Sequence, residues 1–598
     1  MNPRDPEIER AATTEGVPVA PSAADAIQSA RIPLERTLID ARIVLLCVWS
    51  VGVAIVTGFV AQALMAIIGL ITNISFYGRF SFAFSSPANN HLGWLVLVIP
   101  AIGGVIVGYM ARYGSTGIRG HGIPEAMEQV LLNESRIPAR LTFLKPLSAA
   151  IAIGTGGPFG AEGPIIATGG ALGSLLGQIF KTTPAERKTL LAAGAAAGMA
   201  ATFGSPVSAV LLAIELLLFE FRPRSIVPVA LASVAATAVR MFFAGTAPIF
   251  AMPVPAHAGG TALAIYTLVG AVVGWLSVYV TRAVYWAEDF FEHLPVHWMW
   301  WPAIGGLVVG AVGIVAPHTL GVGYDNIEAL VGGHLVGRAV LWLCIFKFVS
   351  WAISLGSGTS GGTLAPLFTI GGACGVVLGE LLAQAAPSLG IDPRICGLVG
   401  MAAMFAGASR ALLASVVFAF ETTLQPLGLL PLLGGCTAGY LVSALLMRNT
   451  IMTEKLARRG VRVPAEYAAD FLDRIHVGEA CSHNVVALRE DQTVEDVADI
   501  TATHQGFPVV DASGKVVGVV TRRDFAGVPG ETKLRQLVRR PPTVVYTDMT
   551  LRDAADHMIR ENIGRLPVVD RSSPPRLVGI LTRSDLLKAQ VQRIEEER

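Results

Sequence analysis

The amino-acid sequence predicts an all-α polytopic membrane domain followed by an α/β domain that lies in water. Of the 598 residues, 53% are hydrophobic and 15% are charged, whereas a soluble domain carries roughly 25% charged residues. Charged residues number 11 in residues 1–40, 34 in 41–450 and 44 in 451–598. We therefore expect residues 41–450 to lie in the membrane, and the last quarter of the chain is too charged to do so.

Basic residues flank the apolar part of the chain. Residues 1–36, rich in Ala, Pro and charge, predict a disordered cytoplasmic tail. Basic residues precede the first apolar run and follow the last: Arg31, Arg36, Arg42, Arg448, Lys455, Arg458 and Arg459. The positive-inside rule then places both termini in the cytoplasm, and we expect a multi-pass protein in the lipid of a bacterial inner membrane. The net charge of +1 gives no reason to expect a nucleic-acid partner.

Fourteen apolar stretches of helical length lie between residues 43 and 447. Several of them, such as 141–155 and 411–423, are too short to cross about 30 Å at 1.5 Å per residue. Glycine and proline interrupt others. A membrane tolerates broken helices where protein or a water-filled cavity satisfies the freed backbone groups. Short, broken helices therefore indicate a transport pathway.

An internal repeat supports this interpretation. Residues 154–177 align with residues 356–379 at a constant offset of 202, and 10 of 24 positions are identical. A second pair follows in each half, residues 198–215 and 400–421, and both members end in a glutamate. Paired broken helices in corresponding places of two halves indicate a substrate site at the repeat interface, near the bilayer midplane.

Three stretches have the form Gly-x-x-x-Pro immediately before an apolar run: Gly120 to Pro124, Gly160 to Pro164 and Gly362 to Pro366. Proline suits the first turn of a helix, and glycine lets the backbone turn there, so each stretch predicts a helix N-terminus with unpaired N–H donors. Such ends stabilise a dehydrated anion without a full positive charge that would trap it. The structural alternative is glycine for helix crossing and proline for helix entry.

These three stretches resemble, in content and order, the anion-binding segments GSGIP, G(K/R)EGP and GxFxP of the CLC family of chloride channels and chloride/proton antiporters. The resemblance covers about residues 40–590. It implies that residues 37–460 form a CLC-type inverted repeat of about eighteen helices, that the protein is a homodimer with one pore per subunit, and that it is a voltage-gated transporter of chloride and other small anions. The anion-binding positions carried over to this sequence are Gly120, His121, Gly122, Ile123, Gly160, Gly163, Thr363, Leu364 and Met452.

Glu162 is the residue on which the functional prediction depends most. It is a carboxylate in an apolar, glycine-rich stretch, and such acids inside a membrane are costly and usually functional. By resemblance it is the gating glutamate, whose carboxylate competes with the permeating anion for the same amides and leaves when protonated. Burial favours protonation. The alternative is a structural acid that caps its own helix.

Three positions in these motifs depart from the family pattern. His121 occupies the central serine position of GSGIP, where a neutral imidazole N–H can donate to the anion and an imidazolium would attract it more strongly. This predicts a pH-sensitive anion site, unless His121 turns aside and backbone amides alone bind. Leu364 replaces the Phe of GxFxP, and Ala161 replaces the Lys or Arg before the glutamate.

Two further departures concern the inner side. Met452 stands where the family has its pore tyrosine, so one hydroxyl donor is lost. Many family antiporters carry two consecutive acids at the end of the helix that corresponds to 205–217, and here Glu215 is followed by Leu216. A leucine cannot carry a proton, so the resemblance favours passive chloride conduction. A chloride/proton antiporter with an atypical inner proton path is the alternative.

Beyond residue 475 the pattern changes to short apolar strands and helices. The elements Pro-Val-Val-Asp and Thr-Arg-x-Asp occur there twice in the same order. Residues 475–592 resemble a tandem pair of CBS domains, at about 475–528 and 532–592. Two pairs match the T-x-x-D element by which many CBS domains hold a nucleotide ribose: Thr521 with Asp524, and Thr582 with Asp585. Adenine-nucleotide binding and a purely structural or dimerising role both stay open.

A membrane-embedded metalloenzyme is the alternative from another class. His293 and His297 have the i, i+4 spacing of a metal site, but Pro295 breaks the helix that would align them. The sequence has no HExxH motif and no CxxC pair among its six cysteines. We therefore expect a protein that is not an enzyme, has no metal site and requires no cofactor. A fluoride exchanger is a rival within transport, but GHGIP and GAEGP keep the chloride-type prolines.

Overall fold

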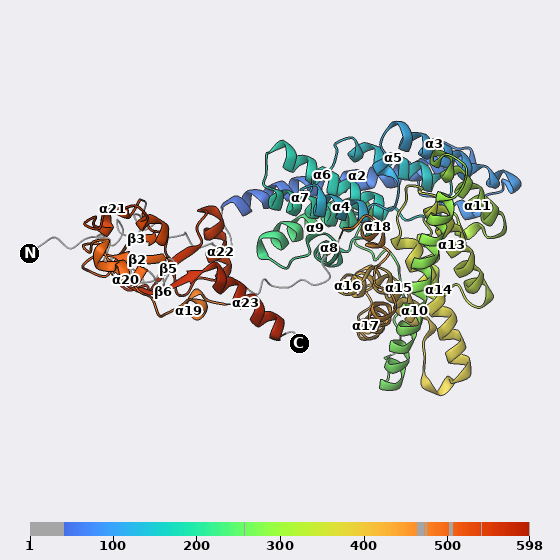
Figure 1. The fold of residues 1–598 in the computed structure, drawn as a ribbon. Helices are drawn as coiled ribbons and strands as arrows, with labels where there is room; N and C mark the ends of the chain where they lie inside the picture. Colours follow the sequence, from blue (N-terminus) through green and yellow to red (C-terminus); the bar gives the residue numbers. More distant parts are fainter. Residues whose placement is uncertain are drawn as a thin grey trace, which may run out of the picture. The chain divides into compact units, whose positions relative to one another are not determined.

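The computed structural model describes residues 41–596 except residues 256, 462, 464–471, 473–474, 502–505, 540 and 574. The tail predicted at residues 1–36 lies outside the described residues. These form two compact units, one within residues 41–463 and one within residues 472–596 (Figure 1). The first unit is helical and the second is α/β, as the sequence predicts.

Seventeen α-helices lie in the described part of the first unit, close to the expected number. Their bounds are α2 Ala41–Tyr77, α3 Ile99–Tyr113, α4 Ile123–Leu132, α5 Leu141–Gly154, α6 Glu162–Ile179, α7 Pro184–Phe203, α8 Pro206–Ala213, α9 Pro223–Ala244, α10 Gly260–Glu292, α11 Trp301–Val315, α12 Tyr324–Gly332, α13 Arg338–Gly356, α14 Leu364–Ala385, α15 Pro393–Ser409, α16 Leu412–Thr423, α17 Leu429–Leu446 and α18 Glu454–Arg458. Among the described residues, eight helical segments are long and apolar enough to cross a membrane, and four further apolar helices are shorter.

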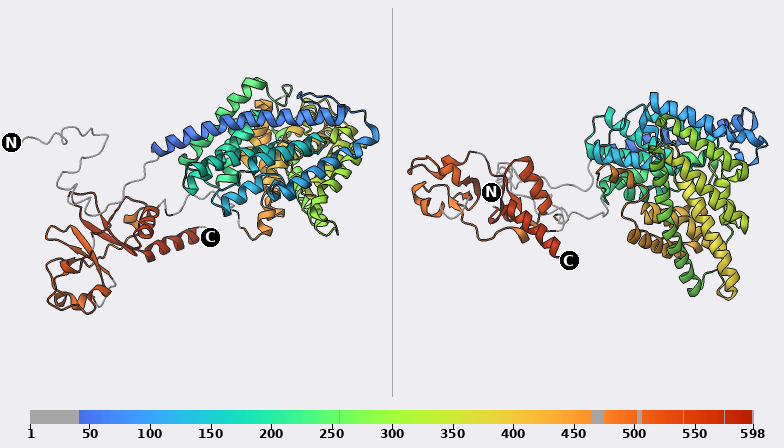
Figure 2. Two further views of the ribbon diagram at one scale, coloured as in Figure 1. Left: turned by 90° about the horizontal axis from the view of Figure 1, so that it is seen from above. Right: turned by 45° about the vertical axis from the view of Figure 1, so that its right-hand side comes forward.

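The membrane unit contains two series of eight helices in the same order, α2 to α9 and α10 to α17. Equivalent helices follow the sequence repeat to within one residue, since α6 begins at Glu162 and α14 at Leu364, 202 positions apart, and α4 begins at Ile123 and α12 at Tyr324, 201 positions apart. Figure 2 shows α2, the first helix of the first series, extending along one side of this unit. The sequence repeat is therefore a repeat of helices.

Glycines let the helices α10 and α17 cross with their backbones in direct contact. A Cβ on Gly270 of α10 would lie 2.2 Å from the carbonyl oxygen of Gly435 in α17. One turn further, a Cβ on Gly274 would lie 2.3 Å from the Cα of Gly439. Small residues at this spacing allow close helix packing inside a membrane. The first helix of the second series is thereby fixed against the last.

Two glutamates exchange helix caps across the repeat. Glu215 lies in the π-helical turn Ile214–Leu218 that continues α8, and it accepts two hydrogen bonds of 3.0 Å from N–H groups in the first turn of α16. Glu421 near the end of α16 accepts two, of 2.9 and 2.8 Å, from the first turn of α8. A carboxylate at a helix N-terminus satisfies unpaired donors and the helix dipole. Each glutamate therefore caps the helix to which the other belongs.

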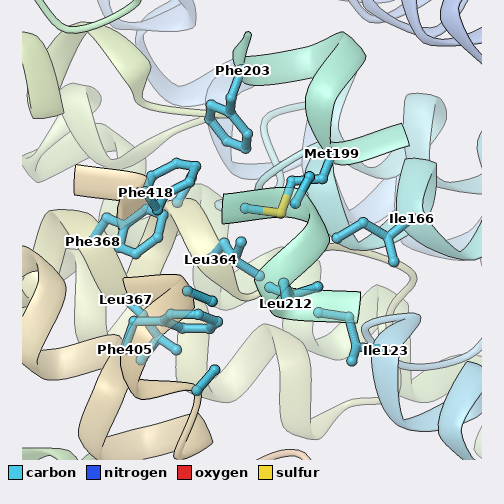
Figure 3. Packing of buried hydrophobic residues seen from close by; sticks show 14 of the residues in the cluster. Ile123, Ile166, Met199, Phe203, Leu212, Leu364, Leu367, Phe368, Phe405 and Phe418 are labelled. Atoms are coloured by element: carbon cyan, nitrogen blue, oxygen red, sulfur yellow. The ribbon is translucent and has the colours of Figure 1, made fainter. Parts of the chain in front are cut away.

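The core around the start of α14 is aromatic. Phe418 of α16 packs against Phe203 of α7 and Phe368 of α14, with ring centroids 4.8 and 4.7 Å apart. Phe368 also packs against Phe405 of α15 at 5.5 Å. Figure 3 shows these rings grouped around Leu364, the first residue of α14. Aromatic packing of this kind joins helices of both series around one helix N-terminus.

The second unit contains two small sheets built to one plan. Each has three strands, in the orders β1-β2-β3 and β4-β5-β6, with the first pair parallel and the second antiparallel. The strands are β1 Leu488–Arg489, β2 Gly506–Val510, β3 Val516–Thr521, β4 Val545–Tyr546, β5 Arg565–Val569 and β6 Leu577–Thr582. The helices are α19 Val477–Ala480, α20 Ala498–Thr501, α21 Leu534–Leu537, α22 Leu551–Arg560 and α23 Arg583–Glu596. The twofold pattern of the sequence is thus a pair of similar modules.

The segment before the first sheet packs against the second module. The N–H of Val477 donates to the Met549 carbonyl at 2.8 Å, and Ser482 pairs with Ile580 of β6. Val477 and Cys481 are buried in the core of the second module. The segment that leads into the first module therefore packs into the core of the second, so the two modules are joined by backbone hydrogen bonds and apolar contacts as well as by the chain.

Candidate anion pathway

Three helix N-termini meet at the interface between the two repeats. Gly160, which precedes α6, and Gly362, which precedes α14, occupy equivalent positions and exchange two backbone hydrogen bonds of 3.3 and 2.9 Å. The segment before α4 joins them, because the Gly361 N–H donates to the Gly120 carbonyl at 3.5 Å. The three predicted helix starts of the form Gly-x-x-x-Pro therefore lie together.

Glycine is required at this junction because the backbones touch. A Cβ on Gly163 would lie 2.1 Å from the carbonyl oxygen of His121, and one on Gly122 would lie 2.4 Å from that of Gly163. Gly120 and Gly122 also adopt φ angles of 86° and 95°, where a side chain is strained. These glycines are therefore required for the close approach of the backbones, independently of any role in anion binding.

Glu162 is the first residue of α6, and its side chain is fully buried. Its Oε1 accepts a hydrogen bond of 2.7 Å from the Tyr324 hydroxyl. Its Oε2 has no hydrogen-bond partner among the described residues and lies 1.7 Å from where a Cβ on Gly160 would be. The carboxyl faces the backbone N–H groups of Glu162 itself and of Ala365 in α14. It therefore occupies the point where the N-termini of α6 and α14 converge.

The N-terminus of α4 is already partly paired. The N–H of Gly122 donates to Glu125 Oε2 at 2.7 Å, and Lys455 of α18 holds Glu125 Oε1 at 3.0 Å. The buried Lys145 donates to two carbonyl oxygens of the segment before α4, both at 2.8 Å. The predicted amide donor at Gly122 is thus bonded to Glu125, and two lysines face one carboxylate at this helix end.

Besides Glu162, two polar side chains of the three motifs contain a buried atom without a partner among the described residues: His121 at its Nδ1 and Thr363 at its hydroxyl. His121 also faces the carbonyl of Ile451. Buried polar groups in proteins are nearly always paired. These two atoms are therefore unsatisfied by the described part of the chain.

The other predicted positions surround the same junction. Ile123 and Leu364, the first residues of α4 and α14, are fully buried. Met452 is fully buried and follows Ile451, the residue that faces His121. The structure therefore brings the three motifs and the segment of the missing tyrosine together.

One cavity is lined by residues of this junction, and a second is lined by the start of α16 and the turn that continues α8. One, of about 420 Å³, is lined by the polar side chains at the start of α4 together with Tyr285 and Glu288. The other, of about 1100 Å³, is lined by Glu215, Leu216 and Arg410, among others. Leu216 therefore lies at the wall of a large cavity, and its acidic neighbour lines the same space.

Three residues outside the predicted set also shape the site: Tyr324, Lys145 and Lys347. Lys347 of α13 donates to the carbonyl oxygens of Thr319 and Gly321 before α12, at 2.9 and 3.1 Å. Lys145 makes the same pair of bonds before α4. The two lysines are 202 residues apart, as the glycines of the repeat are, and this offset is the sequence signal that identifies them.

Both T-x-x-D pairs of the second unit have one geometry. The N–H and hydroxyl of Thr521 donate to Asp524 Oδ2 at 2.8 and 2.6 Å. Those of Thr582 donate to Asp585 Oδ2 at 2.8 and 2.7 Å. Thr521 and Asp524 line a cavity of about 460 Å³ that two arginines also line. A carboxylate and two guanidinium groups suit the ribose hydroxyls and phosphates of a nucleotide.

The two histidines of the alternative metal site have separate partners. His293 Nδ1 lies 2.7 Å from the carbonyl oxygen of Asp289, and the ring of His297 contacts Arg112. Over the part of the chain that the structure describes, no group of three or more His, Cys, Asp or Glu side chains could hold a metal ion.

Two family models match the chain. One, described as voltage gated chloride channel, matches residues 103–444, and the CBS domain matches residues 477–530 and 534–592. The putative chloride channel protein ClcB-like of Ralstonia nicotianae is 26% identical over 61% of this chain and 86% of its own. The H(+)/Cl(-) exchange transporter ClcA of Salmonella arizonae is 29% identical over 63% of this chain and 81% of its own. The chloride channel protein CLC-f of Arabidopsis thaliana is 32% identical over 57% of this chain and 46% of its own.

Solved structures show the same fold. A slow cyanobacterial Cl⁻/H⁺ antiporter aligns with a TM-score of 0.63 at 22% identity, over 69% of this chain and 97% of its own. A eukaryotic CLC transporter aligns with a TM-score of 0.59 at 20% identity, over 91% of this chain and 99% of its own. These relatives are named as channels or transporters, and none of them as an enzyme. The voltage gated chloride channel model matches more than half of the residues of this chain. The chain therefore belongs to the CLC family of chloride channels and transporters, and it carries a C-terminal pair of CBS domains.

Proposed function

We propose that this protein conducts chloride passively through the junction of α4, α6 and α14, and that Glu162 is the gate. The position of the Glu162 carboxyl group carries the proposal, because it is fully buried where two helix N-termini meet. An ionised carboxylate and a chloride ion at that point compete for the same donors. Protonation removes the charge of Glu162, so the side chain loses its attraction to the helix ends and can leave the path.

The electrostatics of the junction suit conduction. Lys145 and Lys347 bring positive charge near the path, but each ammonium is bonded to two carbonyl oxygens. The donors left for an anion are amides, the Thr363 hydroxyl and His121. Partial charges bind an anion strongly enough to admit it and weakly enough to release it.

Leu216 supports passive conduction, because an apolar side chain cannot relay a proton. The second candidate is chloride/proton exchange, and one observation favours it: Glu215 lines the cavity of about 1100 Å³ beside Leu216. Water in that cavity can bring protons to an acid. The Salmonella relative and the cyanobacterial structure are named as an exchanger and an antiporter.

His121 adds a pH-sensitive donor to the proposed site. We assign the contact with the Ile451 carbonyl to Nε2, because Nδ1 has no partner among the described residues; Nδ1 then carries a proton only in the imidazolium form. Nδ1 then donates to the anion in acid, whereas at higher pH it presents a lone pair and no donor. Glu125 attracts the added charge, whereas burial and the ammonium groups of Lys145 and Lys455 oppose it.

We also propose that the CBS pair binds an adenine nucleotide, in the cavity of about 460 Å³ of the first module. Asp524 is positioned for the ribose hydroxyls, and Arg539 and Arg565 for the phosphates. Binding there would regulate gating or stabilise the protein.

The family resemblance supports three further parts of the proposal: a homodimer with one pore per subunit, voltage-gated conduction, and insertion in a bacterial inner membrane. Basic residues at both ends of the apolar part, such as Arg42 and Arg448, favour cytoplasmic termini.

Reversal potentials of the reconstituted protein separate conduction from exchange. Under a chloride gradient at equal pH, passive conduction gives about 59 mV per tenfold gradient. Under a pH gradient at equal chloride, it gives no potential. A reversal potential that moves with the pH gradient, as a fixed exchange ratio requires, would contradict passive conduction.

Replacing the gate tests the role of Glu162. Glutamine cannot ionise, so Glu162→Gln should raise chloride efflux from liposomes at neutral pH by about tenfold or more and abolish acid activation. The exposed Glu328 of α12 supplies the matched control, because Glu328→Gln should keep the wild-type pH response. A wild-type pH response in Glu162→Gln would assign the gate to another group.

The role of His121 is tested in the Glu162→Gln background, where the gate no longer titrates. Chloride affinity measured by calorimetry should rise by about tenfold as the pH falls, because the imidazolium adds one charge-assisted hydrogen bond. In the double variant with His121→Ser, the affinity should not change with pH. An equal pH dependence in both variants would mean that the imidazole does not bind the anion.

Nucleotide binding is tested by titrating AMP and ATP into the full chain in detergent. Asp524→Ala should weaken binding by about tenfold or more, through the loss of charged hydrogen bonds to the ribose. Asp491→Ala is the control, because Asp491 is exposed and pairs with Arg489. If neither nucleotide binds the unaltered protein, the structural or dimerising role stands instead.

A further inference from the structure

Tyr324 lies at the gate although it belongs to none of the three anion-binding motifs. It is the first residue of α12 and follows Gly323, whose φ of 79° turns the chain into the helix. Its hydroxyl donates to Glu162 Oε1 at 2.7 Å. Since Oε2 has no partner among the described residues, this is the one side-chain hydrogen bond that the structure records for the carboxyl group.

The ring of Tyr324 is held in place on several sides. It packs edge-on against Phe203 of α7 and Phe250, with ring centroids 5.7 and 6.1 Å apart. Lys347 fixes the preceding segment by its bonds to the carbonyl oxygens of Thr319 and Gly321. The hydroxyl is thus aimed at Glu162 by packing and does not have to be ordered when the carboxylate arrives.

The equivalent position of the first half has no such group. Tyr324 follows Gly323 at the start of α12 as Ile123 follows Gly122 at the start of α4. Both helices are preceded by a segment that a buried lysine holds. The helix α4 begins with an apolar side chain, whereas α12 begins with a side chain that carries a hydroxyl. The two halves therefore have a similar backbone here but different side-chain chemistry.

We infer that Tyr324 is the latch of the gate: its hydroxyl holds the ionised Glu162 in the anion path and releases it on protonation. The inference rests on the proposed function of Glu162. A hydroxyl bonds more strongly to a carboxylate than to a neutral carboxylic acid. The bond therefore stabilises the ionised, closed form, and more acid is needed to open the path than without it.

Three titratable groups besides Tyr324 lie on the elements packed around Glu162. Lys347 of α13 attracts its charge, but is bonded to carbonyls. Asp325 of α12 is exposed and lies near Lys347. His121, before α4, contacts Gly163 through its backbone. Tyr324 is the group among them that bonds to the carboxylate directly, so its removal should change the pH response without removing a charge.

The test is chloride efflux from liposomes as a function of pH with the full chain. Tyr324→Phe removes one oxygen and should move the pH of half-activation upward by about one unit, because loss of the latch makes the ionised form less stable by about tenfold. Efflux at strongly acid pH, where the bond is already broken, should equal that of wild type. That equality also shows that the variant is folded.

Tyr266→Phe is the matched control. Tyr266 is a buried tyrosine of α10 whose hydroxyl accepts a hydrogen bond of 3.0 Å from the Asp392 N–H, and the variant should keep the wild-type curve. Glu162→Gln with Tyr324→Phe should behave as Glu162→Gln alone, because there is no ionised group left to hold.

The outcomes separate the latch from the gate. If Tyr324→Phe has the wild-type pH curve while Glu162→Gln loses acid activation, the latch is wrong and the proposed gate stands. A uniform loss of efflux at every pH, without an upward shift, also overturns the latch. If Glu162→Gln keeps the wild-type pH response, the proposed gate fails and the latch with it.

Discussion

The two hydrogen bonds between Gly160 and Gly362 are the contact on which the proposed transport site depends. The two glycines occupy equivalent positions of the repeat and donate to each other's carbonyl groups, as a two-fold relation between the halves requires. Because neither has a side chain, the N-termini of α6 and α14 meet at backbone distance. The Glu162 carboxyl fills space that a Cβ on Gly160 would take. No single half of the chain contains this site, which forms only where the folded halves meet.

The buried charges nearby are paired in a repeated way. Lys145 and Lys347 each bond to two carbonyl oxygens, and Glu215 and Glu421 each accept two N–H groups at the start of the other's helix. A buried charge without partners costs several kcal/mol, so these pairings hold helix ends in fixed places. Glu162 is the exception, because one of its oxygens has no partner among the described residues.

The two halves agree in backbone and differ in the residues that carry chemistry. One half begins its central helix, α6, with Glu162, and the other begins α14 with Leu364. The smaller helices α4 and α12 begin with Ile123 and Tyr324. The repeat therefore supplies converging helix ends, whereas substitutions within it supply a buried acid, the proposed gate, on one side and a hydroxyl donor on the other.

Local signals in the sequence determined the membrane domain, the helix starts and the acid at Glu162, because hydrophobicity, the Gly-x-x-x-Pro spacing and the repeat are properties of neighbouring residues. Tertiary structure alone decided which of these helix ends touch. It placed Tyr324 against a carboxylate 162 positions earlier, and it bonded the predicted donor Gly122 to Glu125. Such contacts depend on how the two halves dock. That docking is set by backbone approach at glycines and by buried polar pairs, and neither has a periodicity that a sequence pattern can reveal.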